Sequence, residues 1–571
     1  MSYRFAIIGG GLTATSMVCQ LVDKLKDPQS GARKCASDLF IDVFEKQNEL
    51  GPGLPHSEQF VLPFHVTNMC AKDMTVRIAR PNDFQAWALC NSRSVAENFP
   101  ELADALLETE AEHSRCRHYP RAIMGEYLKD QIGGAVRAAQ DIGLNLTLNA
   151  NSEVIDLVEI DGHMYLATKD SAGCRGRAGP FDGVLLATGH WAERRKHDNF
   201  FSSPWPAQEL LRKIPSGAQV GVIGSSLSAI EVALTLTSDG QFCRRPDGEL
   251  TYLPSGTPRK LTLYSRRGRL PRVRGRIGTR PNRYLTCERL LSAIAAHPYQ
   301  LKLSMIFELF DRELAEAYGQ RINWHLVVKP TGTPAALLED DLARALKGDG
   351  TDGERIWQTA LVQIFPVLRE VYLHLEPAER DRFDRDFNTH FFLHAATQPA
   401  INGEKILALM KAGIVSVVRL GNDYRLGQND ATGDFEITYQ GCEGKRCCDV
   451  FSYCVDARGQ TRSVVSDSSE LIQNLLRKEI VELDHITAAR SGKSDSKDVI
   501  KTGSIKVDPD THRILRPQKS TANADFSTRG EIDLFAVGAM TRGQIIDSSM
   551  AYGLARSTAT VADLLIAGLN G

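Results

Sequence analysis

The start of the chain is a glycine-rich turn between an apolar strand and a helix. Residues 4–8 (RFAII) have the composition of a buried strand, three glycines follow at once, and a small alanine stands at position 14. Gly9 allows the tight turn, Gly11 lets the backbone approach a pyrophosphate, and Ala14 lets the helix pack closely on the strand. Because the helix N-terminus then points toward negative charge, this segment predicts a dinucleotide-binding βαβ unit.

An acidic residue ends the next apolar strand. Residues 40–45 read FIDVFE, so Glu45 stands where a carboxylate accepts a hydrogen bond from the adenosine ribose. The position of the turn between a strand and a helix, with this acid after the following strand, makes the motif far more specific than its glycines alone.

A second turn of the same kind follows about 200 residues later. Residues 219–231 read QVGVIGSSLSAIE, which places Gly224, Ser225 and Ser226 between a strand and a helix. The next apolar strand ends in Arg266 and Arg267, and an arginine neutralises a 2′-phosphate where an acid would hold a ribose hydroxyl. The pair of turns therefore predicts FAD at the first site and NADPH at the second, as in flavoproteins that pass a hydride from nicotinamide to flavin.

Length and composition indicate a globular protein of several domains. The chain has 571 residues, of which 42% are hydrophobic and 24% are charged. No run of about 18 apolar residues is present to span a membrane. The first strand begins at residue 3 or 4, which leaves no room for a signal peptide, so we expect a cytoplasmic protein whose twelve cysteines are thiols.

Eight arginines lie within the 18 residues 266–283, although the net charge of the chain is only −2. One interpretation is a solvated loop or a patch that binds polyanions. The other is that the first members bind the NADPH phosphate and later ones hold an anionic substrate. Arg272, Arg274 and Arg276 alternate, so on a strand they would share one face and could converge on a carboxylate. The overall charge does not favour a general nucleic-acid binder.

Several further segments carry a family resemblance. These are GPGLPH at 51–56, HVTNM at 65–69, DFQAW at 83–87, YPRAIMGEYL at 119–128, ATGH at 187–190 and GAMTRG at 538–543. Together with the first turn they resemble the bacterial FAD/NAD(P)-binding protein family, over residues 1 to about 270 and 450–571. The resemblance implies a flavoprotein fold related to N-hydroxylating and other two-domain monooxygenases, and some relatives oxidise the amine of aspartate.

The resemblance also implies roles for residues near the flavin. Thr188 and Gly189 lie where the chain leaves the FAD domain, and Gly538 and Thr541 belong to the turn that reaches the flavin ring. His56, His65 and Asn68 are candidates for lining the isoalloxazine. Hydrogen bonding within their own loops is an equally good interpretation of these three residues.

The predicted fold is α/β, with two Rossmann-like domains and a helical insertion. We expect an FAD-binding domain at 1–205 and 450–571, an NAD(P)H-binding domain at 206–280 and 422–449, and a mainly helical insertion at 281–421. In the insertion, Pro377 marks a helix start. His390 and His394 have an i, i+4 spacing, but without further ligands we interpret them as a structural pair and expect no metal site.

Cysteine spacing argues against one competing class of enzyme. A disulfide reductase needs a redox pair beside the flavin, commonly Cys-x-x-Cys, and Cys442, Cys447 and Cys448 have the wrong spacing.

The function that these features predict is an NADPH-dependent flavoprotein monooxygenase. Its expected substrate is small, anionic and amine-bearing, and it would be oxidised by a flavin C4a-(hydro)peroxide formed with dioxygen. Two alternatives remain open. One is a flavin reductase or NADPH oxidase that passes electrons to a partner, and the other is an RNA-modifying or regulatory nucleotide-binding flavoprotein.

Overall fold

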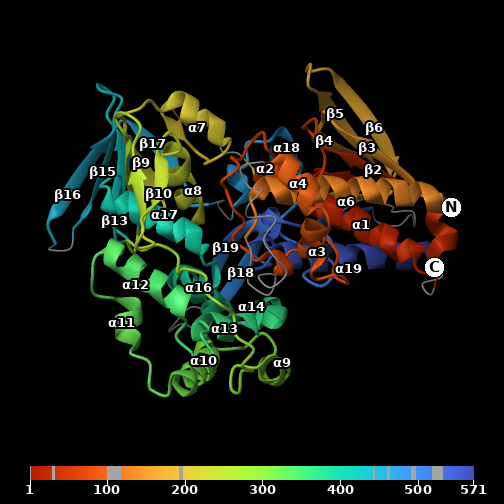
Figure 1. Ribbon diagram of the computed structural model, residues 1–571. Coiled ribbons are helices and arrows are strands. Elements are labelled where there is room, and N and C mark those ends of the chain that lie inside the picture. The colour runs from red at the N-terminus through yellow and green to blue at the C-terminus, as the bar shows by residue number, and fades with distance from the viewer. Residues whose placement is uncertain are drawn as a thin grey trace. The chain divides into compact units, whose positions relative to one another are not determined.

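The computed structural model describes residues 2–28, 32–99, 118–191, 197–350, 352–441, 444–459, 463–489, 497–516 and 532–570. The chain divides into two units, both visible in Figure 1. Unit 1 comprises residues 1–58, 69–193 and 460–571, and unit 2 comprises residues 59–68 and 194–459. Each unit contains a five-stranded parallel sheet built around one of the two glycine-rich turns.

The sheet of unit 1 aligns the carboxyl ends of its strands. Its order is β20 (Asp533–Ala536), β7 (Gly183–Leu186), β1 (Tyr3–Ile8), β2 (Leu39–Phe44) and β3 (Asn145–Asn149), and every neighbouring pair is parallel. Ile8 lies opposite both Phe44 and Leu186. The residues that follow these three strands therefore meet at one edge of the sheet, where ligands bind in open α/β folds.

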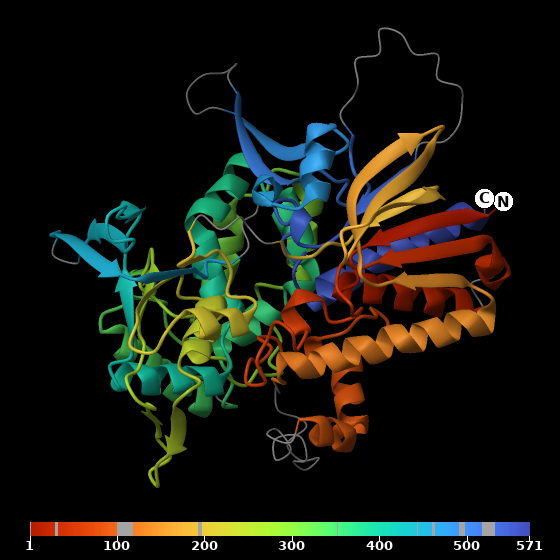
Figure 2. The same ribbon diagram turned by 90° about the horizontal axis from the view of Figure 1, so that it is seen from above.

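Helix α1 (Leu12–Lys26) follows β1 and packs against α6 (Arg121–Ile142) and α19 (Ala551–Asn570). Figure 2 shows α6 on one side of β1 and β2, and a three-stranded antiparallel sheet on the other side. That sheet consists of β4 (Ser152–Ile160), β5 (His163–Asp170) and β6 (Arg175–Phe181). Both faces of the parallel sheet are covered, which explains why β1 and β7 are almost continuously apolar.

Shorter elements complete unit 1. They are η2 (Ala32–Asp38), α2 (Gly53–His56), η3 (Ala71–Asp73), α3 (Asp83–Cys90), α4 (Ser92–Asn98), η8 (Val464–Ser466), α18 (Glu470–Arg477), the hairpin of β18 (Leu483–Ala489) with β19 (Lys497–Ile505), and η9 (Ala539–Thr541).

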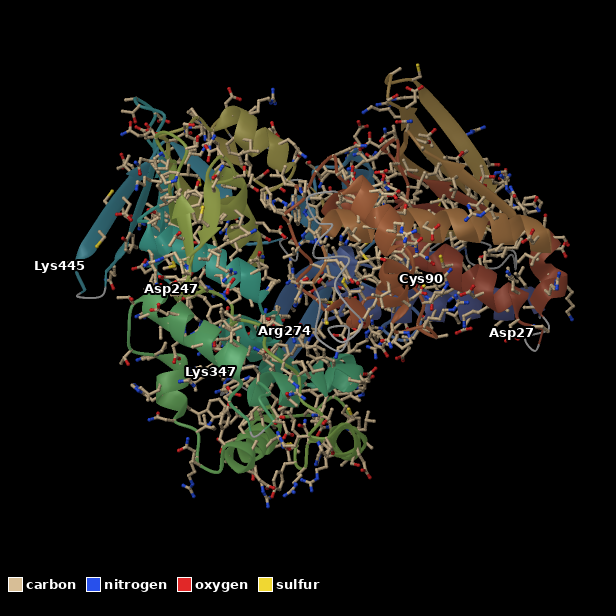
Figure 3. All side chains as sticks on the ribbon, viewed as in Figure 1. Asp27, Cys90, Asp247, Arg274, Lys347 and Lys445 are labelled. Atoms are coloured by element: carbon tan, nitrogen blue, oxygen red, sulfur yellow. The ribbon has the colours of Figure 1, made fainter. Side chains whose placement is uncertain are left out.

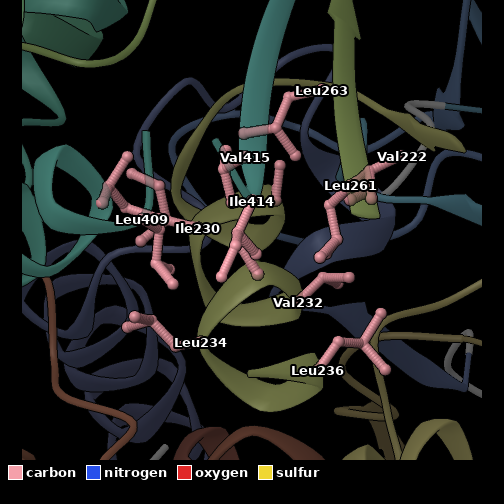
Figure 4. Close-up of a cluster of buried hydrophobic side chains, with 14 of the residues drawn as sticks. Val222, Ile230, Val232, Leu234, Leu236, Leu261, Leu263, Leu409, Ile414 and Val415 are labelled. Atoms are coloured by element: carbon pink, nitrogen blue, oxygen red, sulfur yellow. The ribbon is translucent and has the colours of Figure 1, made fainter. Parts of the chain in front are cut away.

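Unit 2 has a parallel sheet of its own. Its order is β13 (Val415–Arg419), β12 (Lys260–Ser265), β9 (Gln219–Ile223), β17 (Tyr453–Asp456) and β8 (Phe200–Phe201). Helix α8 (Leu227–Leu236) follows β9 and is buried along almost its whole length. Figure 4 shows side chains of α8, among them Ile230 and Leu234, in one hydrophobic cluster with Leu261 and Leu263 of β12.

Most of the remaining residues of unit 2 form the helical insertion. Its elements are α9 (Cys287–Ala296), α10 (Leu303–Tyr318), α11 (Trp324–Val328), α12 (Pro334–Lys347), α13 (Ile356–Val362), η6 (Phe365–Val367), α14 (Leu368–His374), α15 (Pro377–Arg382), the π-helical η7 (Phe383–Phe387), α16 (Asn388–Ala395) and α17 (Ala400–Lys411). Outside it lie α7 (Ala207–Lys213), the hairpin β10 (Gln241–Arg244) and β11 (Leu250–Leu253), and the antiparallel sheet β14 (Tyr424–Gln428), β15 (Phe435–Gln440) and β16 (Arg446–Phe451).

The structure confirms an α/β fold with two parallel sheets and a helical insertion, and Pro377 is indeed the first residue of α15. Three strands lie elsewhere than expected. β8, placed by sequence in the FAD-binding domain, pairs with β17 in unit 2. β17, placed by sequence in the FAD-binding domain, pairs with β9 in unit 2. β13, placed by sequence in the helical insertion, pairs with β12 and so extends the same sheet.

Candidate functional site

The first glycine turn is fitted tightly to the edge of its sheet. Gly9 has φ +103°, and a Cβ built on it would lie 2.4 Å from the carbonyl oxygen of Ala187. Only glycine therefore fits this position. Gly11 is the N-cap of α1, no side chain caps it, and Ala14 in the first turn is fully buried. The uncapped N–H groups and the helix dipole suit a pyrophosphate.

Glu45 is held beside this turn. Its side chain is 7% exposed. Its Oε2 accepts a 2.6 Å hydrogen bond from the Gly10 amide, and Oε1 accepts one from the Gln47 amide at 2.9 Å. Each carboxylate oxygen has a further lone pair, so Glu45 can still accept from a ribose hydroxyl. The residues present at this edge thus fit the adenosine half of FAD.

Four of the residues that sequence assigned to the flavin side lie around the same edge. Gly189 has φ +69° and follows half-buried Thr188 after β7. Gly538 has φ +113° and follows β20. Thr541 is buried, and its hydroxyl donates to the Gly538 carbonyl at 2.9 Å.

A cluster of histidines and arginines lies within unit 1. Burial and the guanidinium of Arg121 lower the pKa of the buried His56 to about 3, and His190 contributes to the shift. Burial, Arg542 and Arg121 lower the pKa of His190 to about 4. Both imidazoles are therefore uncharged at neutral pH. Among the described residues the buried Nδ1 of His56 has no hydrogen-bond partner.

No role was predicted for Arg121, His190 or Arg542, although the segments that contain them carry the family resemblance. The available signal was their placement: Arg121 begins α6 directly after a proline, and His190 and Arg542 each follow a strand end by a few residues. Polar residues at such positions are frequent ligand contacts in α/β folds.

His65 and Asn68 lie elsewhere. Both belong to the segment 59–68, which is part of unit 2, whereas His56 is part of unit 1. His65 is 1% exposed, and its Nδ1 accepts from the Leu62 amide at 3.2 Å. Its Nε2 therefore carries the proton and donates to Thr235 of α8 at 2.9 Å. Both ring nitrogens of His65 thus have partners within unit 2, and Asn68 is half-buried.

The second glycine turn repeats the construction of the first. Gly224 has φ +122°, and a Cβ on it would lie 2.6 Å from the carbonyl oxygen of Ala457, after β17. Ser225 Oγ is 2.5 Å from the Arg269 carbonyl oxygen. Ser226 is exposed at the N-cap of α8 and its side chain makes no capping bond. A phosphate can thus approach the N-terminus of α8.

Arg266 and Arg267 follow β12 at the same edge, and both contact the helical insertion. Arg266 donates to the Thr389 hydroxyl of α16 at 3.1 Å, and Arg267 donates to the Asp386 carbonyl at 3.0 Å. Burial, together with Arg267 and Arg269, lowers the pKa of His390 to about 4. The result is a group of cationic side chains around an uncharged imidazole, which suits a phosphate dianion.

The rest of the arginine run is not a strand of converging side chains. Arg272 pairs with Asp341 at 3.3 Å, and exposed Arg276 donates to the Asp352 carbonyl at 2.7 Å. Arg269 donates to the Val327 carbonyl, Arg280 pairs with Glu313, and Arg283 pairs with Glu316. The run therefore serves largely to attach the insertion. Arg274, labelled in Figure 3, differs from these, because its Nε is buried and has no hydrogen-bond partner among the described residues.

His394 is buried in the insertion and stacks on Trp357, with ring centroids 4.0 Å apart. Among the described residues no group of three His, Cys, Asp or Glu side chains is arranged to hold a metal ion. In the same ranges no helix has the length and apolar character needed to cross a bilayer. Cys447 and Cys448 are thiols on β16, and Cys442 lies outside the described residues.

Comparison with known proteins agrees with this geometry. Residues 6–191 match the model of the FAD-NAD(P)-binding family. The uncharacterized protein YdhS of Escherichia coli (strain K12) is 24% identical over 486 residues, which are 81% of this chain and 84% of that protein.

Among solved structures, the reduced form of ornithine hydroxylase from Pseudomonas aeruginosa has a TM-score of 0.52 at 10% identity, with all of both chains covered. An ornithine N-hydroxylase from Kutzneria sp. 744 has a TM-score of 0.49 at 12% identity, again with all of both chains covered. The family match and the first of these folds confirm the prediction of an FAD- and NAD(P)-binding flavoprotein with two Rossmann-like domains.

Proposed function

We propose that this protein is an NADPH-dependent flavin monooxygenase that oxidises a small substrate. The observation that carries the proposal is the difference between its two turns. Glu45 ends the second strand of one sheet, while Arg266 and Arg267 end the corresponding strand of the other. An acid suits a ribose hydroxyl and an arginine suits a 2′-phosphate, so the two sites suit FAD and NADPH respectively.

In unit 1, the N–H groups at the start of α1 bind the pyrophosphate of FAD and Glu45 binds its ribose. When bound, FAD supplies hydride acceptance from NADPH and the reaction with dioxygen. The protein's own contribution is to position the cofactor and to keep water from the reacting centre.

His56 is the residue that we assign to the flavin ring. Its Nδ1 is buried without a partner among the described residues, and a buried polar atom without a partner is costly. Because its pKa is lowered to about 3, His56 meets the ring as a neutral hydrogen-bonding group over the whole physiological range. Burial and the neighbouring positive charge of Arg121 keep its imidazole uncharged.

In unit 2, the N-terminus of α8 binds the pyrophosphate of NADPH, and Arg266 and Arg267 bind its 2′-phosphate. Thr389 holds Arg266 at 3.1 Å, so part of the side-chain entropy of the arginine is lost before the nucleotide arrives. The ornithine hydroxylase with a similar fold acts on an amino acid that carries amines, which supports an amine-bearing substrate here.

The test is reduction of the purified, FAD-loaded protein by NADPH without oxygen, followed by addition of dioxygen. We expect NADPH to bleach the flavin and NADH to do so far more slowly. With the correct amine substrate, NADPH consumption rises while hydrogen peroxide release falls. Failure of NADPH to reduce the flavin would overturn the proposal.

The same experiment identifies the alternatives. If every NADPH consumed yields peroxide, whatever small molecule is added, the protein is an oxidase or passes electrons to a partner. Nothing observed favours an RNA-binding role, because seven of the eight clustered arginines are attached to side chains or carbonyl groups of residues 313–389.

A further inference from the structure

Arg419 ends β13, the strand that lies beside β12 in the sheet of unit 2. Ser265 and Arg419 are register partners at the carboxyl ends of these two parallel strands. The two chains stay together beyond the strands. The Leu420 amide donates to the Ser265 carbonyl at 2.9 Å, and the Gly421 amide donates to the Arg266 carbonyl at 3.1 Å. The backbone of Arg419 is therefore fixed beside the arginines that follow β12.

The side chain of Arg419 lies on the face of the sheet that the second glycine turn uses. Register partners in a parallel pair project to the same face, so Arg419 and Ser265 share one face. Ser265 Oγ is 2.8 Å from Ser225 Oγ of the turn. A Cβ built on Gly268, in the loop after β12, would lie 2.8 Å from the Arg419 Cβ. Dinucleotide folds hold the adenosine ribose at the end of the strand after the turn, which here is β12, so Arg419 borders that position.

Three guanidinium groups gather at these strand ends without a described carboxylate in ion-pair contact. Arg266 and Arg267 donate only to neutral oxygens, a hydroxyl and a backbone carbonyl. The exposed side chain of Arg419 has no hydrogen bond or ion pair with another described residue. Burial lowers the pKa of Arg267, and the charges of Arg266 and Arg419 lower it further.

The one acid that acts against this shift in Arg267 is Asp386. Its carboxylate is already paired with Arg385 at 3.3 Å, so it does not neutralise the three arginines. Like charges held together repel one another, and an anion bound among them removes that cost. Clusters of this kind are frequent at binding sites.

A phosphate monoester has the chemistry that this cluster requires. It carries roughly −1.5 to −2 charges at neutral pH and presents three acceptor oxygens. Guanidinium groups bind such oxygens with strong, charge-assisted hydrogen bonds. The ribose hydroxyl that NADH has at the same position is uncharged, so each added arginine widens the difference between the two nucleotides.

We propose that Arg419 is a third arginine of the 2′-phosphate site and contributes to the selection of NADPH over NADH. This role rests on the proposed function, because it requires that the nucleotide binds at the turn of unit 2. No local motif marks Arg419, and only the pairing of β13 with β12 brings it to the site.

The experiment is isothermal titration of the oxidised, FAD-loaded protein with adenosine 2′,5′-bisphosphate and with AMP, which differ only in the 2′-phosphate. We expect the bisphosphate to bind more tightly. Arg419→Ala is expected to weaken its binding about threefold to tenfold, because an exposed charge-assisted contact is lost, and to leave the binding of AMP nearly unchanged. Arg419→Lys should recover part of the loss, since the charge is kept but the planar fork is not.

Arg425→Ala is the matched control. Arg425 is an exposed residue of β14, and its replacement removes the same charge from the same unit. It is expected to change the binding of neither nucleotide. The proposal is overturned if Arg419→Ala binds the bisphosphate like the unaltered protein, if it weakens AMP equally, or if Arg425→Ala has the same effect as Arg419→Ala.

Arg266→Ala separates this role from the proposed function. If the advantage of the bisphosphate over AMP depends on Arg266 but not on Arg419, the NADPH site is retained and the role of Arg419 is wrong. If the unaltered protein binds the two nucleotides equally, or binds neither, both the NADPH site and the role of Arg419 are wrong.

Discussion

Gly11 is the residue at which backbone geometry and cofactor binding are most directly linked. A Cβ on Gly11 would have its nearest neighbour, the Gly53 Cα, at 3.4 Å, which is an ordinary contact. Gly11→Val is therefore expected to fold but to place its side chain where the pyrophosphate must lie, and so to lose FAD. The measurement is the flavin absorbance per protein after purification with added FAD.

Gly568→Val is a suitable control, since nothing lies within 4 Å of a Cβ built on Gly568 in α19. It is expected to retain a full complement of FAD. Normal flavin content in Gly11→Val would show that the first site has been placed wrongly.

Arg266 determines the choice of nicotinamide nucleotide in our proposal. Arg266→Ala is expected to remove a charge-assisted contact worth about 1.5–3 kcal/mol, which corresponds to a rise of roughly 10- to 150-fold in KM for NADPH. KM for NADH should hardly change, because NADH has no 2′-phosphate. Steady-state kinetics with both nucleotides measure the difference.

Arg283→Ala provides the comparison for Arg266→Ala, because exposed Arg283 belongs to the same run but pairs with Glu316 of α10. It should alter neither constant. Equal changes for NADPH and NADH in Arg266→Ala would mean that this arginine only anchors α16.

His56 makes the stability of unit 1 depend on pH. Its folded-state pKa of about 3 lies below the ordinary value of 6.5, mainly because it is buried. The unfolded chain then binds more protons than the folded one between these two values, so the stability present above pH 6.5 is lost as the pH falls. The slope reaches at most about 1.4 kcal/mol per pH unit for this group.

Urea unfolding at a series of pH values measures this slope. His56→Gln is expected to make it shallower. An unchanged slope in the variant would mean that other groups account for the acid sensitivity.

The site residues that could be predicted from the sequence are those whose role is marked by a motif of nearby residues. Gly9, Gly224 and Glu45 were found because a tight turn and a strand end leave marks within a few residues of sequence. The bond between His65 and Thr235 spans 170 positions, and no local pattern reports it. The side-chain partners of the arginine run, such as Asp341, were missed for the same reason.

At the scale of elements, strands were recognised more reliably than the sheets to which they belong. An apolar run such as VSVVR in β13 predicts a strand, but pairing with β12 depends on how the chain returns after more than 100 residues. The same holds for β17, whose partner is β9. Amphipathic helices of the insertion were predictable because their apolar period of three to four residues is local.

Helix α12 is fastened to the arginine segment through one buried carboxylate. Asp341 is 2% exposed and accepts from the Val273 amide at 2.6 Å, as well as from Arg272 and Arg355. Asp341→Asn keeps the shape of the side chain but removes its negative charge. Buried Arg355 then has one carboxylate partner, Asp349, in place of two. We expect the substitution to lower the free energy of unfolding by about 3 kcal/mol, measured by urea denaturation.

The preceding residue supplies the control. Asp340 pairs with Arg344 on the exposed side of α12, with 56% and 57% of the two side chains exposed. Asp340→Asn is expected to cost less than about 1 kcal/mol, as is usual for a surface pair. Similar losses in both variants would contradict the anchoring role of Asp341.

At the scale of the whole molecule, the residues that we propose for each dinucleotide site belong to a single unit. Gly11 and Glu45 belong to unit 1, and Ser226 and Arg266 belong to unit 2. A ligand that binds only the folded protein raises the protein's free energy of unfolding by about 2.7 kcal/mol when the ligand is present at 100 times its Kd. FAD and NADP⁺ should therefore each stabilise the protein. A substitution in one site should abolish the stabilisation by its own nucleotide and leave the stabilisation by the other nucleotide unchanged.

Ser226→Glu is the counterpart of Gly11→Val. Ser226 is exposed and its side chain makes no capping bond, and an acid at a helix N-terminus is favourable, so α8 should still form. The new carboxylate would repel the pyrophosphate of NADP⁺. We expect Gly11→Val to lose the rise in thermal midpoint given by FAD and to keep that given by NADP⁺, and Ser226→Glu to show the reverse. Loss of both responses in either variant would mean that the two nucleotides do not occupy separate sites.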